Sequence, residues 1–75
     1  MSDNIVNWDA IVHKNVRTSD RVDAGTVIEI EADTIVLEKG STTEYIIPKE
    51  RVEGFNGAEV SLSIPYNELG QYKKK

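Results

Sequence analysis

The sequence contains no cysteine and only one histidine, His13. Without cysteine there can be no disulfides, thiolate zinc sites or cysteine nucleophiles, and one imidazole is too few for a histidine-rich metal site. A catalytic His13 would also need a nucleophile and an orienting acid, and no serine near it lies in a strained nucleophile turn. We therefore expect no catalytic residue, metal ligand or cofactor, and predict that the protein is not an enzyme.

Long apolar runs are missing as well. No segment has the roughly 18 uninterrupted apolar residues that a membrane-spanning helix needs. The N-terminal sequence "MSDNIVNWD" is acidic and polar, which is unlike a secretory signal peptide. Together with the absence of cysteine, these features predict a cytoplasmic protein.

Positive charge is scarce. Thirteen Asp and Glu residues outnumber nine Lys and Arg residues, and the formal net charge is −4 at pH 7. Three of the nine bases form the terminal Lys73–Lys75, so the rest of the chain has a balance of −7. Binding to nucleic acid needs a basic face that replaces phosphate counterions, and the acidic body argues against it. The lysine tail is interpreted as a solubilising segment, with contact to an acidic lipid surface or a second copy as alternatives.

The clearest periodicity in the chain is two, which is typical of a strand with one buried face. In "AEVSLSI" the apolar positions from Ala58 to Ile64 alternate with Glu59 and two serines. In "GTVIEIEAD" we expect Ile28 and Ile30 to point inward and Glu29 and Glu31 outward. The segments "TIVLEK" and "EYIIP", and a short stretch around Val16–Thr18, are further predicted strands.

Turn signals separate these strands at short intervals. Asn56-Gly57 is a strong hairpin signal because both residues tolerate the positive φ of a type I′ turn. A chain of 75 residues has room for one domain. We predict an all-β fold, a small antiparallel barrel of five to six short strands, because closure removes edges prone to aggregation. The glutamates on its outer faces are read as a solvated, edge-protecting surface; acid–base chemistry or Ca²⁺ or Mg²⁺ binding is the alternative.

The charged triplet Lys49-Glu50-Arg51 follows Pro48 directly. Proline fixes its own φ and cannot donate to a sheet ladder, so it is expected to end the preceding strand. The three charged residues then form a helical turn outside the barrel, and Val52 returns the chain to the core. A contact of Lys49 or Arg51 with a partner at the rim stays open.

Three segments together resemble the PRC-barrel domain family, and its single-domain archaeal members most: "AGTVIEI", "TIVLEKG" and "EYIIPKERVEGFNGAEVSL". In that family a strand ends in an apolar-apolar-Pro step, a short turn follows, and a valine returns to the barrel. The matching positions are Gly25, Tyr45, Ile47, Pro48, Val52, Asn56 and Gly57.

The resemblance implies a non-enzymatic protein–protein interaction or scaffold module, such as an adaptor in archaeal cell division. It further implies a cytoplasmic protein recruited to a membrane-associated assembly, with a membrane-anchored division protein as one partner. The alternative is an RNA-processing or ribosome-maturation accessory factor. It is suggested by a maturation factor of the same family, although we expect no counterpart here of that factor's separate N-terminal domain.

The domain is expected to span residues 11–65. Residues 1–10 are predicted to form a flexible or partner-contacting segment, and Asp9–His13, across its boundary with the domain, are predicted to form one helical turn. Residues 66–75 are predicted to form a partly disordered tail with a turn at Asn67–Leu69. Aromatic residues in such flanks are typical interface anchors, and a homodimer is predicted. The candidate partner contacts are Trp8, Lys49, Arg51, Tyr66 and Tyr72, with Trp8 as a plug of the barrel end the alternative.

Overall fold

The computed structural model describes residues 7–74, and its main element is one six-stranded sheet. This confirms the predicted all-β class. The strands are β1 (Asn15–Arg17), β2 (Asp23–Ile30), β3 (Thr34–Lys39), β4 (Thr43–Pro48), β5 (Val52–Phe55) and β6 (Glu59–Leu62).

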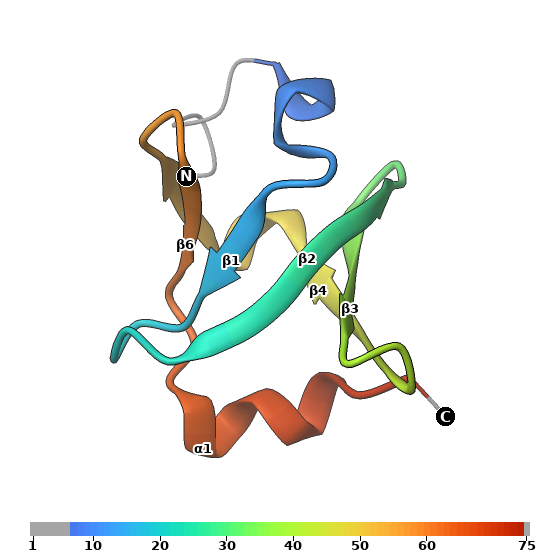
Figure 1. Cartoon of the computed structure of the whole chain (residues 1–75), viewed down its shortest axis with the longest axis vertical. Helices are drawn as coiled ribbons and strands as arrows, with labels where there is room; N and C mark the ends of the chain where they lie inside the picture. Colours follow the sequence, from blue (N-terminus) through green and yellow to red (C-terminus); the bar gives the residue numbers. More distant parts are fainter. Residues whose placement is uncertain (1–6, 75) are drawn as a thin grey trace.

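The sheet order is β4-β3-β2-β1-β6-β5, with β1 to β4 forming an antiparallel meander and β5 and β6 a hairpin (Figure 1). The expectation of a closed, purely antiparallel barrel is wrong on two counts. β1 and β6 pair in parallel, and within residues 7–74 the end strands β4 and β5 do not pair with each other. Turn residues determine how consecutive strands pair, but the paired residues of β1 and β6 are 44 positions apart in the sequence.

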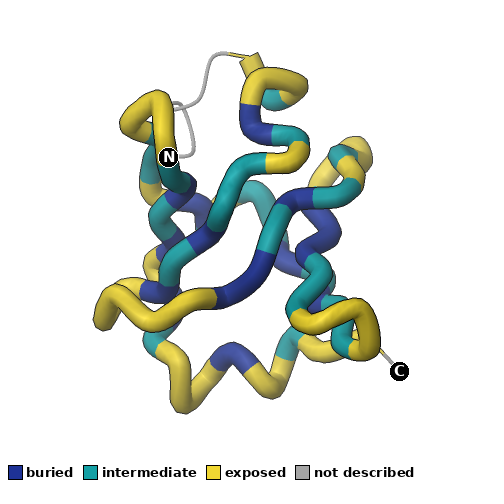
Figure 2. Tube along the Cα trace, in the orientation of Figure 1, coloured by how far each residue is buried: buried dark blue, intermediate teal, exposed yellow. Residues whose placement is uncertain are grey.

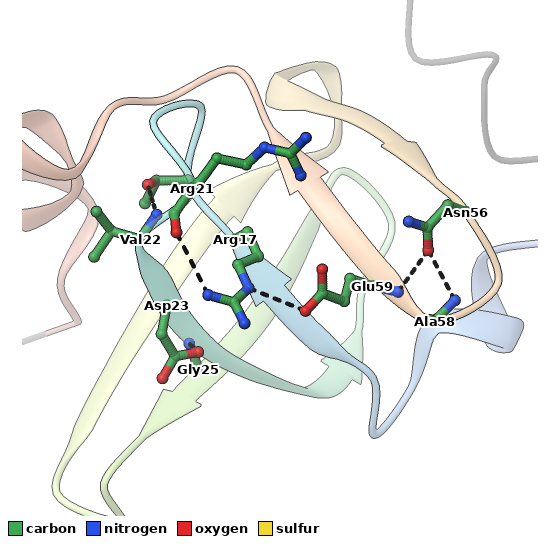
Figure 3. Close-up of polar contacts among 9 residues, drawn as sticks. Arg17, Arg21, Val22, Asp23, Gly25, Asn56, Ala58 and Glu59 are labelled. Atoms are coloured by element: carbon green, nitrogen blue, oxygen red, sulfur yellow. Dashed lines mark hydrogen bonds and ion pairs between the residues drawn. The ribbon is translucent and has the colours of Figure 1, made fainter.

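Side chains also join the two strands at the parallel junction (Figure 3). Arg17 Nε donates to Glu59 Oε2 at 3.0 Å, and Arg17 Nη1 donates to the carbonyl of Arg21 at 3.4 Å. Glu59 is therefore not merely a solvated outer-face carboxylate, because it connects β6 to β1.

The helical segments are short and lie between or beyond the strands. They are the 3₁₀ helices η1 (Trp8–Ile11), η2 (Lys49–Arg51) and η3 (Gly70–Tyr72), and the α-helix α1 (Tyr66–Leu69). η2 confirms the helical turn predicted after Pro48. η1 begins one residue before the predicted turn and ends before His13, whose φ of 71° places it in a left-handed turn. Within residues 7–74 no helix is long and apolar enough to span a membrane.

The core lies on the inner side of the curled sheet, with exposure confined largely to turns and flanks (Figure 2). The alternation predicted for the last strand is confirmed, since Val60, Leu62 and Ile64 are fully buried. Ala58 is exposed because it belongs to the preceding turn. The fully buried apolar residues are Ile11, Val16, Ala24, Val27, Ile35, Leu37, Ile47, Val60, Leu62, Ile64 and Leu69.

β2 departs from simple alternation. A register shift between Val27 and Glu29 leaves Ile28 as an extra residue, so Val27 and Ile30 contact the core and Ile28 does not. Glu29 and Glu31 are exposed as predicted. The prediction that Ile28 points inward is wrong because a bulge changes which residues face the core.

The β5–β6 turn also differs from its predicted type. Gly57 has a φ of +96°, but Asn56 does not have the positive φ that a type I′ turn requires. Asn56 Oδ1 instead accepts hydrogen bonds from the backbone N–H groups of Ala58 and Glu59 at 2.9 and 2.8 Å. The asparagine thus stabilises the turn through its side chain rather than through left-handed backbone.

The segment after Pro65 packs onto the sheet instead of ending the domain. Leu69 is fully buried in the core, and Lys73 forms an isolated antiparallel bridge with Tyr45 of β4. The Lys74 N–H donates to the Glu44 carbonyl at 2.7 Å. Residues 66–74 are therefore part of the domain, in contrast to the predicted boundary at 65 and the partly disordered tail. Residues 1–6 of the predicted N-terminal segment and Lys75 of the tail lie outside the described residues.

Candidate interaction surfaces

Two of the five predicted partner contacts, Trp8 and Lys49, come together at one end of the molecule. Lys49 Nζ lies 4.9 Å from the centroid of the Trp8 ring, within the range of a cation–π interaction. The ring packs partly against the hydrophobic core and is partly exposed. Trp8 therefore covers one end of the core, as in the alternative reading, while part of its surface stays accessible.

Backbone contacts fix the position of both side chains. Asn7 caps η1, its Oδ1 accepting from the Asp9 N–H at 3.1 Å, and the burial of Ile11 anchors the same helix. The Lys49 N–H donates to the Asp33 carbonyl at 2.8 Å. This bond joins η2 to the β2–β3 turn.

A surface hollow of about 490 Å³ lies where these two segments meet. Its lining combines apolar groups with two carboxylates and is contributed by the β2–β3 turn and the start of η2. The lining residues are Ala32, Asp33, Thr34, Pro48, Lys49 and Glu50.

Tyr66 lies at the opposite end of the sheet from η1, at the start of α1 (Figure 1). Its side chain is 47% exposed, and Lys39 Nζ lies 5.3 Å from the ring centroid. Lys39 Nζ also donates to the Asp23 carbonyl at 2.9 Å. The ammonium group therefore bridges the start of β2 and the aromatic ring.

The backbone of Tyr66 is held by the β1–β2 turn. Asp20 Oδ1 accepts from the Tyr66 N–H at 3.1 Å and also from the hydroxyl of Thr18, which is 2% exposed. Thr18 Oγ1 in turn accepts from the Val22 N–H at 3.0 Å. The hydrogen bond from Thr18 is the main cause that lowers the pKa of Asp20, and the Tyr66 N–H adds to it; partial desolvation opposes both. These hydrogen bonds favour the ionised form of the carboxylate beside the start of α1.

The other two predicted contacts, Arg51 and Tyr72, are less exposed. Tyr72 packs partly against the core. Arg51 is half-buried, its carbonyl accepts two hydrogen bonds from Ser63, and no described residue accepts from its buried Nε. The five predicted residues thus do not form one surface: Trp8 and Lys49 share an end, and Tyr66 marks the other.

Sequence reasoning missed one neighbour of the Tyr66 ring, namely Lys39. Lys39 ends the strand "TIVLEK", and this segment carries no motif that predicts contact with residue 66. Only the tertiary structure brings the end of β3 next to the start of α1. The sequence indicated only Tyr66 itself, because it is an aromatic residue in a short flanking segment.

His13 is an exposed turn residue. Its backbone N–H donates to the Val27 carbonyl at 2.7 Å, which joins this turn to β2. Among residues 7–74, no group of three or more His, Asp or Glu side chains is placed to hold a metal ion. Comparison with protein-family models and with curated proteins gave no match.

Proposed function

We propose that the chain is a PRC-barrel-type protein–protein interaction module that acts as a non-enzymatic adaptor in archaeal cell division. The sequence resemblance around Pro48 is the reason for the family and for the cellular role. The observation that carries the interaction role is the pair of partly exposed aromatic residues, Trp8 and Tyr66, at opposite ends of one sheet. Two such anchors allow one small domain to contact two partners, or one partner and a second copy.

The side chains of Trp8 and Tyr66 are already held in place in the absence of a partner. The rings are positioned by capped or hydrogen-bonded backbone, and a lysine ammonium group lies over each ring. A preorganised aromatic side chain loses little conformational entropy on association, so more of the contact energy contributes to affinity. The end strand β5, which no further strand of residues 7–74 flanks, offers backbone groups for pairing with a partner strand.

The proposal is tested by affinity capture from archaeal lysate with the intact chain, followed by mass spectrometry. We expect recovery of a membrane-anchored division protein, with weaker recovery by a Trp8→Ser, Lys49→Glu variant. Lys14→Glu is the matched control, because it introduces the same charge change at a site outside the two anchors. Salt-sensitive capture of ribosomal RNA or ribosomal proteins, with no division protein, would instead favour the maturation-factor alternative.

Self-association is measured separately by sedimentation velocity. A homodimer is expected at micromolar concentration, weakened by the same Trp8→Ser, Lys49→Glu variant. Truncation of residues 65–75 is unsuitable for this purpose because it would remove Leu69 from the core. A chain that is monomeric at all concentrations and captures no protein would contradict the interaction role itself.

A further inference from the structure

The surface hollow between the β2–β3 turn and the start of η2 has walls that the backbone holds together. Thr34 of β3 pairs with Pro48 of β4, and the Lys49 N–H donates to the Asp33 carbonyl at 2.8 Å. The β2–β3 turn lies at the end of the molecule that also carries η1 (Figure 1). Because backbone contacts set its shape, the hollow is formed before any ligand binds. We call it the Asp33–Glu50 hollow.

Negative charge collects at this hollow. Asp33 and Glu50 line it and are exposed, and within residues 7–74 neither carboxylate accepts a hydrogen bond or forms an ion pair. Glu31 adds a third carboxylate beside the lining, because its Oε1 accepts from the hydroxyl of Thr34 at 3.2 Å. Two of the three carboxylates are therefore available to a ligand.

The lysine of the hollow does not neutralise these carboxylates. Lys49 is the one cation among the six lining residues, and its Nζ lies 4.9 Å from the centroid of the Trp8 ring. No ion pair within residues 7–74 joins it to Asp33 or Glu50. Arg51, the other cation of η2, does not line the hollow. The lining thus carries an excess of negative charge that a cationic ligand would balance.

We propose that the Asp33–Glu50 hollow binds a lysine or arginine side chain from a segment of a partner protein. The inference rests on the adaptor function above, and it names one binding surface and the chemistry of the partner that fits it. The aliphatic stem of the basic side chain packs on Ala32 and the ring of Pro48. Its cationic head donates to the carboxylates of Asp33 and Glu50.

The size and lining of the hollow favour a side chain over a free inorganic cation. Its volume of about 490 Å³ is far larger than a metal ion needs, and part of its lining is apolar. Among residues 7–74 no group of three or more His, Asp or Glu side chains could hold a metal ion. Lys49 belongs both to the hollow and to the Trp8 contact, so a segment seated here lies next to one anchor of the adaptor. The net charge of −4 also attracts a basic segment.

The test is a selection of random peptides displayed on phage against the intact chain. Enriched peptides are expected to share a Lys or Arg. A synthetic enriched peptide should bind roughly tenfold more weakly to the double variant Asp33→Asn, Glu50→Gln, the combined effect of two exposed ion pairs. Replacing the basic residue of the peptide by norleucine, which keeps the aliphatic stem and removes the charge, should weaken binding by a similar factor.

The double variant Asp23→Asn, Glu68→Gln is the matched control. It removes the same two negative charges at exposed positions in β2 and α1 and leaves the lining of the hollow unchanged, so peptide affinity should change less than about twofold. Lys49 is kept in every variant because its side chain also contacts Trp8. Circular dichroism establishes that each variant is folded.

Nuclear magnetic resonance locates the bound peptide. Chemical shifts of the labelled chain should change most at residues 32–34 and 48–50. Spermidine, a free polyamine, should displace the peptide only weakly, because it cannot make the contacts of the flanking peptide segment.

Enrichment of acidic or uncharged peptides, or of none, would overturn the proposal. Equal losses of affinity in the two double variants would do the same, since they would show attraction to net charge alone. Shift changes centred on Tyr66, or spermidine binding as tight as that of the peptide, would also contradict it. In each of these cases the adaptor function survives. Its own failure has a different signature, a chain that stays monomeric and captures no partner from lysate.

Discussion

Gly25 of β2 lies against the backbone of β3 at Glu38. Its φ is +106°, and a Cβ built on it would be 2.4 Å from the carbonyl oxygen of Glu38. Two separate constraints therefore require glycine here: the backbone conformation and the approach of a neighbouring backbone that cannot move aside. Gly57 shares only the first constraint, since its φ is +96° and a Cβ at this position would point into open space, with no neighbouring segment within 4 Å.

These two glycines form a matched pair for mutation. We expect Gly25→Ala to lower the free energy of unfolding by roughly 2–5 kcal/mol, from left-handed backbone plus an overpacked contact. Gly57→Ala should cost only about 1–2 kcal/mol, the backbone part alone. Urea unfolding followed by circular dichroism measures both. Equal losses for the two variants would show that the contact with Glu38 has no energetic weight.

Asp20 gives the protein a pH-dependent contribution to stability. Its pKa in the folded state is lowered from the ordinary value of 3.8, mainly by the Thr18 hydroxyl. A carboxyl group with a lowered folded pKa stabilises the fold above its unfolded pKa, and this contribution is lost as pH falls through the folded value. Asp20→Asn keeps an acceptor oxygen but cannot ionise.

We therefore expect the melting temperature of the wild-type chain to fall more steeply than that of Asp20→Asn between about pH 5 and about pH 3. Thermal melts at a series of pH values provide the measurement. Asp9→Asn is the control, because that carboxylate is exposed outside the β1–β2 turn. Parallel pH profiles for wild type and Asp20→Asn would show that Asp20 does not contribute to the pH dependence of stability.

At the scale of elements, the C-terminal segment shows how a short helix is stabilised by packing. α1 has four residues, too few for a helix to be stable alone in water. It is held by the bond from its first N–H to Asp20, by Leu69 in the core, and by η3 and Lys73 against β4. Among residues 65–74 only Leu69 is fully buried, so the sequence "PYNELGQYKKK" carries little apolar pattern that would predict this packing.

This packing predicts a large effect of Leu69→Ala. The substitution removes a fully buried side chain and should destabilise the chain by about 2–5 kcal/mol. Gln71→Ala, an exposed position in η3, should change stability by less than about 0.5 kcal/mol. Chemical denaturation of the two variants gives the comparison. If Leu69→Ala were as stable as Gln71→Ala, residues 66–74 would be a detachable tail.

At the scale of the whole molecule, one core connects the sheet to both flanks. Ile11 and Leu69 are buried with residues from the strands, so η1 and α1 should unfold together with the sheet. Trp8 is the sole tryptophan and packs against this core, which makes its fluorescence a specific reporter on η1.

We expect the urea midpoint from Trp8 fluorescence to coincide with the midpoint from far-ultraviolet circular dichroism. Coincident transitions are the signature of a single cooperative unit. A fluorescence transition at clearly lower urea would mean that η1 detaches first, which is the behaviour expected of a flexible N-terminal segment.

The sequence by itself determined the features that depend on near neighbours. Alternation in "AEVSLSI" predicted the buried face of β6, and Pro48 predicted the end of β4 and the turn Lys49–Arg51. Each of these rests on local backbone geometry or on the period of a strand, which are properties of a few consecutive residues.

The tertiary structure alone decided how distant segments meet. It placed β6 parallel to β1, inserted the bulge at Ile28, buried Leu69 and brought Lys39 to Tyr66. Such contacts depend on the shape of the whole core and on which backbone groups are left to pair, and no local pattern encodes them. For that reason the sequence identified aromatic residues in the flanks, but it could not predict that Trp8 and Tyr66 lie on two separate surfaces.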